Sequence, residues 1–250
     1  MKLVVNADDF GLSKEVNEGI IEGFEKGIIT SASILANYSL NLPERKKLGL
    51  GVHLNITFGN SLVDGKKFPS NMLTRAVLMK TQPGFVEKEF RKQIETLQNI
   101  GYKLDHLNTH QHIHVIPPLN NIVYKLAREY KIKYVRYPNE KLTKINKNII
   151  SYSIAKYHIE ITKNFPKDLV TSKEFFGFMD TGNPSLKNYL SYLNFKDTAE
   201  ICCHPSKGLS TDGSKLTNSR QKELKVLTNK ILIEEIKNKK IKLVRCKDLW

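Results

Sequence analysis

Two neighbouring carboxylates, Asp8 and Asp9, follow the first apolar run of the chain. The run Leu3–Val5 predicts a β-strand, along which successive side chains point to opposite faces. Both carboxylates can reach one pocket only if the backbone bends there, and Gly11 allows such a bend. One carboxylate could then bind a metal ion while the other transfers a proton. Taken alone, this pair is explained equally well by a solvated turn.

Four histidines supply further metal-binding groups at the expected ends of two other strands: His53, His110, His112 and His114. A strand over 104–114 would place the last three on one face, because side chains repeat every two residues. One histidine alone is more often structural, whereas three in alternation favour a functional site. Arg136 and His204 also stand where strands are expected to end.

A carboxylate and two imidazoles can bind a divalent cation and leave positions open for water and substrate. Such a cation polarises a carbonyl group and lowers the pKa of bound water towards about 7. A second carboxylate outside the metal shell could remove the proton of that water, and another proton carrier would protonate the leaving group. The residue types therefore favour a metal-dependent hydrolase.

Apolar periodicity and turn residues predict alternating strands and helices. Strands are expected at 3–5, 28–36, 104–114, 132–136, 198–204 and 241–244, and one further strand ends at 53. Helices are expected at 13–27, 85–99, 119–130, 141–165, 185–193 and 218–237. Loops are expected at 55–84 and 205–217. About seven strand–helix units indicate an α/β fold close to a (β/α) barrel with one unit missing or irregular. The aromatic run Phe175–Phe178 fits either a core segment or a wall for a sugar ring.

Composition limits the classes of protein to consider. The chain has 250 residues, 40% of them hydrophobic, and a formal net charge of +15, which together predict a folded protein with a sizeable core. No stretch approaches the roughly 18 apolar residues of a membrane span, and no secretory signal is apparent, so a cytoplasmic protein without a membrane partner is expected. Scattered lysines supply most of the positive charge, which argues against a nucleic-acid partner.

Five separated motifs resemble one known family. They are Asn6–Gly11, Gly51–Leu54, His106–His114, Phe175–Phe178 and Cys203–Pro205. In order and spacing they resemble the YdjC-like carbohydrate deacetylases, which include chito-oligosaccharide deacetylases, along nearly the whole chain. The resemblance implies one domain over residues 1–250, a distorted (β/α) TIM-like barrel, and removal of acetyl groups from N-acetylated sugars or oligosaccharides.

The resemblance also implies roles for individual residues. Asp9, His53 and His110 would be the metal ligands, Asp8 the general base, His204 the general acid, and His112, His114 and Arg136 would orient ligands or substrate. Magnesium is the cation that the resemblance implies, although two imidazoles suit zinc or another transition metal better. Asn108 stands where the family commonly has Asp. Loss of that carboxylate could weaken metal affinity or mistune an imidazole, although the Asn amide can still accept a hydrogen bond.

Two other functions remain open from the sequence. A phosphoesterase could use the same metal, and the positive charge would suit it, although such enzymes generally carry an alternating histidine run on the first strand. A non-catalytic carbohydrate-binding barrel is the other alternative, but a binding protein has no need of an acid, a base and metal ligands together. The sequence identifies no interface and leaves a homo-oligomer open.

Overall fold

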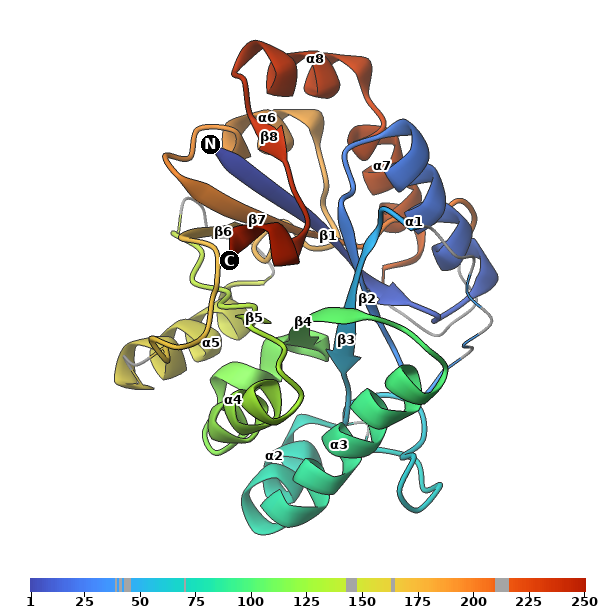
Figure 1. The fold of residues 1–250 in the computed structure, drawn as a ribbon, viewed down its shortest axis with the longest axis vertical. Coiled ribbons are helices and arrows are strands. Elements are labelled where there is room, and N and C mark those ends of the chain that lie inside the picture. The colour runs from blue at the N-terminus through green and yellow to red at the C-terminus, as the bar shows by residue number, and fades with distance from the viewer. Residues whose placement is uncertain are drawn as a thin grey trace.

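The apolar strands form one curled, parallel β-sheet in a computed structural model, which describes residues 1–38, 40, 42, 46–69, 71–142, 148–162, 165–209 and 216–250 (Figure 1). The strands are β1 (Lys2–Phe10), β2 (Ser31–Ile34), β3 (Gly49–Leu54), β4 (Leu104–Thr109), β5 (Tyr134–Val135), β6 (Glu174–Phe176), β7 (Thr198–Cys203) and β8 (Lys242–Leu243). Their order is β5-β4-β3-β2-β1-β7-β6, with β8 beside β1. The sheet is a half-barrel, which confirms the predicted α/β, barrel-like fold.

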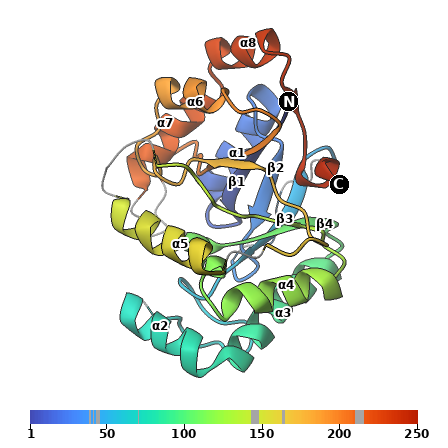
Figure 2. The ribbon, with the colours of Figure 1, turned by 90° about the vertical axis from the view of Figure 1, so that its left-hand side faces the viewer.

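Helices surround the outer face of the curled sheet (Figures 1 and 2). They are α1 (Lys14–Lys26), α2 (Met72–Thr81), α3 (Pro83–Asn99), α4 (Leu119–Glu129), α5 (Ile149–Thr162), α6 (Leu186–Tyr192), α7 (Thr217–Leu227) and α8 (Lys230–Asn238), with 3₁₀ segments η1 (His110–Val115) and η2 (Cys246–Leu249). Helix α1 begins where the Ser13 hydroxyl accepts a hydrogen bond from the Val16 amide, and its apolar face is buried. No helix among the described residues is long and apolar enough to cross a membrane.

Strand β1 is the centre of the sheet and of the core. It pairs with β2, β7 and β8, and every residue after Lys2 is buried. Fully buried aliphatic side chains contribute roughly 1.5–3 kcal/mol each, so this strand is strongly anchored. The carboxyl end of β1 is therefore a rigid platform for Asp8 and Asp9, which lie in its last residues.

Several expectations about local structure are corrected. Strand β4 ends at Thr109, and the next residues form η1, in which Gln111 and His112 have left-handed φ values of 59° and 54°. The three imidazoles therefore do not alternate on one strand face, because left-handed residues cannot continue a strand. Helix α2, which Asn71 caps, lies inside the expected loop 55–84.

Two further differences concern the carboxyl-terminal half. The expected helix 218–237 is two helices, because the Asn229 side chain accepts a hydrogen bond from the Ile231 amide and begins α8 there. Residues 174–176 form β6, an unpredicted strand. Parts of the expected helix 141–165 and of the expected loop 205–217 lie outside the described residues.

Candidate active site

Asp8 and Asp9 reach one buried site because the backbone bends at Asp9 itself. Asp9 has φ +68°, and the register between β1 and β2 shifts at this point. The two side chains are therefore not directed to opposite faces of the sheet, and both are buried. The sequence predicts this bend at Gly11, whereas the structure has it two residues earlier, at Asp9.

Asp8 is an anchored carboxylate. Arg136 donates to it through both terminal nitrogens, at 2.6 Å to Oδ2 and 2.8 Å to Oδ1, and Oδ1 also accepts from Asn6 at 2.8 Å and Asn108 at 3.2 Å. Burial raises the pKa of Asp8, but the charge and hydrogen bonds of Arg136, together with the nearby imidazoles of His53 and His204, outweigh burial and hold that pKa well below its usual range. Asp8 is therefore ionised at neutral pH, and its Oδ1 is saturated with donors.

Asp9 has one oxygen engaged and one available. Its Oδ2 accepts from Arg220 of α7 at 2.6 Å, while its buried Oδ1 accepts no hydrogen bond among the described residues and lies 3.4 Å from His53 Nε2. Burial raises the pKa of Asp9, but Arg220 and the imidazoles of His53 and His110 together outweigh burial, so that the pKa lies well below the usual range. A buried, ionised oxygen without a donor is a suitable cation ligand.

His53 and His110 complete the set that the sequence predicts. The Nδ1 atom of His53 contacts Asn108 Oδ1 at 2.7 Å, and Nδ1 of His110 contacts the hydroxyl of Thr57. The two rings lie 5.6 Å apart, nearly perpendicular. Burial lowers the pKa of His110 to about 4, so this imidazole is neutral at pH 7. Because each Nδ1 is hydrogen-bonded, each Nε2 is the atom left to bind a cation. The donor types suit a divalent cation, and the pair Asp9 Oδ1 and His53 Nε2, 3.4 Å apart, is where one could bind.

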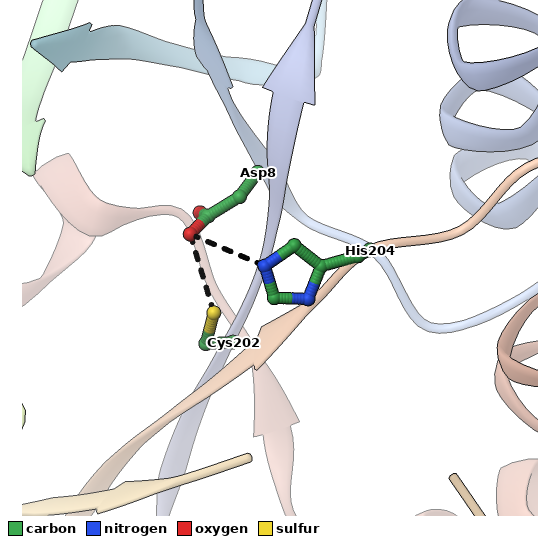
Figure 3. A group of neighbouring side chains, drawn as sticks. All are labelled: Asp8, Cys202 and His204. Atoms are coloured by element: carbon green, nitrogen blue, oxygen red, sulfur yellow. Dashed lines mark hydrogen bonds and ion pairs between the residues drawn. The ribbon is translucent and has the colours of Figure 1, made fainter. Parts of the chain in front are cut away.

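His204 follows β7 and lies beside Asp8 and Cys202 (Figure 3). Its Nε2 is 4.0 Å from Asp8 Oδ2, and the Cys202 thiol donates to the same oxygen at 3.2 Å. The Asp8 oxygen, the Cys202 sulfur and the His204 ring nitrogen are all possible metal ligands, and they lie within 4.8 Å of one another. Burial raises the pKa of the Cys202 thiol well above its usual value, so it is a neutral donor to Asp8 rather than a thiolate ligand.

His112 and His114 lie behind these residues. Both ring nitrogens of His114 are used, Nδ1 with the Thr109 hydroxyl at 2.6 Å and Nε2 with the Arg136 carbonyl oxygen at 2.8 Å. The His112 ring packs edge-on against Phe175 and Phe178, with centroids 5.7 and 4.8 Å away. His114 therefore fixes the backbone that carries Arg136, and His112 joins η1 to the aromatic run.

Sequence patterns did not single out several buried polar residues around the site: Ser33, Glu200, Cys202 and Arg220. Glu200 accepts from Arg136 Nε and from the Tyr134 hydroxyl, both at 2.7 Å, and so ties β7 to β5. A glutamate between Ala199 and Ile201 inside an apolar strand is a signal that could have identified it. Arg220 is a buried arginine in a chain whose cations are mostly lysine, which is a weaker signal of the same kind.

Comparison with known proteins places this arrangement in a family. A carbohydrate deacetylase from Clostridium beijerinckii is 34% identical over 269 aligned positions covering 100% of both chains, and one from Brevibacillus brevis is 34% identical over 266 positions with the same coverage. A crystal structure from Enterococcus faecalis, of a protein for which cellobiose-phosphate cleavage has been suggested, superposes with a TM-score of 0.81 at 23% identity and covers 99% of this chain and 98% of its own.

The sequence model of one family, described as YdjC-like protein, matches residues 2–238. That range contains both aspartates, the histidines of β3 and η1, and the two arginines that hold the aspartates. The structural likeness independently agrees on the fold over nearly the whole length of both chains. The chain therefore belongs to the YdjC-like protein family.

Proposed function

We propose that this protein is a metal-dependent hydrolase that removes acetyl groups from N-acetylated sugars or oligosaccharides. The observation that carries the proposal is the donor-free Oδ1 of Asp9 facing His53 Nε2, beside the anchored carboxylate of Asp8. The relatives of this family that are named carbohydrate deacetylase support the reaction class. An open cation site next to a fixed base suits metal-assisted amide hydrolysis.

Each residue has one role in the proposed reaction. Asp9, His53 and His110 would hold the divalent cation, which when bound polarises the acetyl carbonyl and activates water at neutral pH. Asp8 accepts the proton of the attacking water at Oδ2, since its Oδ1 is saturated. His204, 4.0 Å from that oxygen, donates a proton to the departing sugar nitrogen.

The identity of the cation follows from the donor set in part. Two imidazoles and one carboxylate favour zinc or another transition metal, whereas resemblance to the family favours magnesium. We propose that the protein binds both and that zinc binds more tightly. Metal-stripped protein titrated with each ion would measure the two dissociation constants directly.

Substrate selection is assigned to the segment 55–84 and to the aromatic run Phe175–Phe178. The first contacts the site directly, because Arg75 of α2 donates to Gln111 at 2.7 Å and the Thr57 hydroxyl bonds His110. Exchange of segment 55–84 with that of a relative should change substrate preference more than metal content. A change in metal content alone would contradict this assignment.

The test is acetate release from a panel of N-acetylated mono- and oligosaccharides by metal-stripped protein resupplied with magnesium, zinc, manganese or cobalt. Release should require metal, Asp8→Asn should keep the metal and lose most turnover, and His53→Ala should lose the metal. Asp168→Asn, which removes an exposed carboxylate, is the matched control and should behave as wild type. Turnover of an aryl phosphate without acetate release would instead favour a phosphoesterase, and binding without turnover a carbohydrate-binding protein.

A further inference from the structure

Ser33 lies in a buried hydrogen-bond chain that joins the candidate active site to the amino-terminal end of β4. Its Oγ contacts Asn6 Nδ2 at 2.8 Å, Asn108 Nδ2 at 2.7 Å and His106 Nε2 at 3.0 Å. The chain continues from His106 Nδ1 to Asp105 Oδ1 at 2.5 Å. None of these side chains is assigned a part in the proposed reaction.

The carboxylate of Asp8 fixes which way both amides point. Asn6 and Asn108 each place the amide atom that contacts Ser33 beside Asp8 Oδ1 as well, at 2.8 and 3.2 Å. An ionised carboxylate only accepts hydrogen bonds, so both amides must present their NH₂ groups there. The oxygen of Asn108 then faces His53 Nδ1, which must carry a proton.

The remaining proton positions in this hydrogen-bond chain follow from a count of donors and acceptors. A serine hydroxyl has two acceptor positions and one proton. Two amide N–H groups fill the acceptor positions of Ser33, so its proton is donated to His106 Nε2. His106 then carries its own proton on Nδ1 and donates it to Asp105.

The strand opposite is shaped to hold the His106 ring. Gly51 of β3 pairs with His106, and a Cβ atom at Gly51 would lie 2.4 Å from His106 Cδ2 and 2.4 Å from its carbonyl oxygen. His106 is 1% exposed, and its ring also meets Tyr134 edge-on at 6.5 Å. The ring is thus confined by its neighbours as well as by hydrogen bonds.

We propose that His106, held by Asp105, is a positioning residue that keeps the Nε2 lone pair of His53 free for the cation. Without an acceptor at His106, the Ser33 proton competes with the amide protons of Asn6 and Asn108. Rotation of the Asn108 amide relieves that conflict at the cost of its 3.2 Å hydrogen bond to Asp8 Oδ1, which keeps its donors from Asn6 and Arg136. The rotation also turns the Asn108 NH₂ group towards His53 Nδ1. His53 must then carry its proton on Nε2, where the cation would bind.

The proton arrangement stands independently of the reaction, whereas the effect on cation binding rests on the proposed function. Imidazole nitrogen NMR of metal-free, ¹⁵N-histidine-labelled protein distinguishes the two tautomers, with signals assigned by loss in single histidine variants. His53 and His106 should both be Nδ1–H tautomers. An Nε2–H tautomer at His106, or protonation of both its nitrogens, would overturn the proposal.

Two substitutions at one position then separate hydrogen bonding from packing. His106→Gln keeps an oxygen that can accept the Ser33 proton, and this variant should bind Zn²⁺ with an affinity within about threefold of wild type. His106→Phe keeps only a ring, and it should bind Zn²⁺ roughly 10–100-fold more weakly, which is the usual cost of losing such a hydrogen-bond partner. The Phe variant should also show His53 as the Nε2–H tautomer, with KM for the sugar unchanged. Circular dichroism confirms folding.

The outcomes distinguish this proposal from the proposed function. Equal zinc affinity in wild type and His106→Phe, with the same His53 tautomer, would overturn the positioning role even if acetate is released. The expected tautomers and affinities without acetate release would support the positioning role while contradicting the deacetylase proposal. Asp105→Asn retains an oxygen acceptor for His106 Nδ1–H and should resemble wild type in both measurements.

Discussion

Replacement of Arg136 by Met tests how much the buried ion network stabilises the protein. The Arg136 side chain is 0% exposed and holds two carboxylates, Asp8 and Glu200, at 2.6–2.8 Å. Removal of one partner from a buried network leaves charge uncompensated in the interior and costs about 3–5 kcal/mol. Since total stabilities are typically about 5–15 kcal/mol, this is a large fraction. Met fills a similar volume, so lost packing contributes little.

The assay is urea unfolding at neutral pH, with thermal melting as a second probe. A cost of about 3–5 kcal/mol corresponds to a fall in Tm of roughly 6–20 °C for a chain of this size. Arg128→Met is the matched control: it breaks a pair of similar geometry, 2.7 and 2.9 Å to Asp168, whose partners are 48% and 58% exposed. Solvent screens that pair, so the control should melt close to wild type.

The pH dependence gives the sign of the effect. In the wild type the pKa of Asp8 is depressed, so its stabilisation is present above its ordinary value of 3.8 and is lost only as pH falls below that value. In Arg136→Met burial dominates and raises the pKa of Asp8, so acid stabilises the folded variant by protonating the Asp8 carboxylate. The difference between the two proteins should therefore narrow on acidification. Equal losses in Arg136→Met and Arg128→Met, or a gap that widens in acid, would refute this reasoning.

Three further predictions concern other parts of the molecule. Gly177→Ala should lower the urea midpoint, because φ is +102° and a Cβ would lie 2.3 Å from the Cys202 carbonyl oxygen; Gly65→Ala, at φ +71° in open space, should lower it less. The 3 cysteines are buried and should react with a thiol reagent only in denaturant. Burial raises the pKa of Glu140 from its ordinary value of 4.5 to about 7. The contribution of this group to the free energy of unfolding is therefore fully present below pH 4.5 and falls as the pH rises to about 7, and Glu140→Gln should flatten that dependence in urea titrations at several pH values.

Much of the candidate site follows from sequence and topology together. Parallel strands end at the same edge of the sheet, so residues at or just beyond the carboxyl ends of β1, β3, β4 and β7 had to meet once the strands were recognised. Asp8, His53 and Asn108 do so, and His204 lies beside them. The resemblance to the family supplied the roles, which the fold itself does not specify.

The conformation of η1 could not be predicted, because distant contacts determine it. Alternating histidines have the period of a strand, but His112 packs against Phe175 and Phe178, and His114 bonds the carbonyl oxygen of Arg136. These contacts stabilise left-handed backbone that local sequence would not favour. The partners of the two aspartates were hidden for the same reason, since Arg220 lies 211 positions from Asp9.

The central place of β1 also determines when the site can form during synthesis. Asp8 and Asp9 are made early, but Cys202 and Arg220, which hold them, lie 194 and 211 positions later. At about 5–20 residues per second, the ribosome needs roughly 10–40 s to supply Arg220 after Asp9. The Asp9 carboxylate cannot be buried stably before its partner Arg220 has been synthesised. Contacts so distant in sequence also form slowly. The site is therefore completed late, and a chain that stops before α7 would lack Arg220, the partner of Asp9.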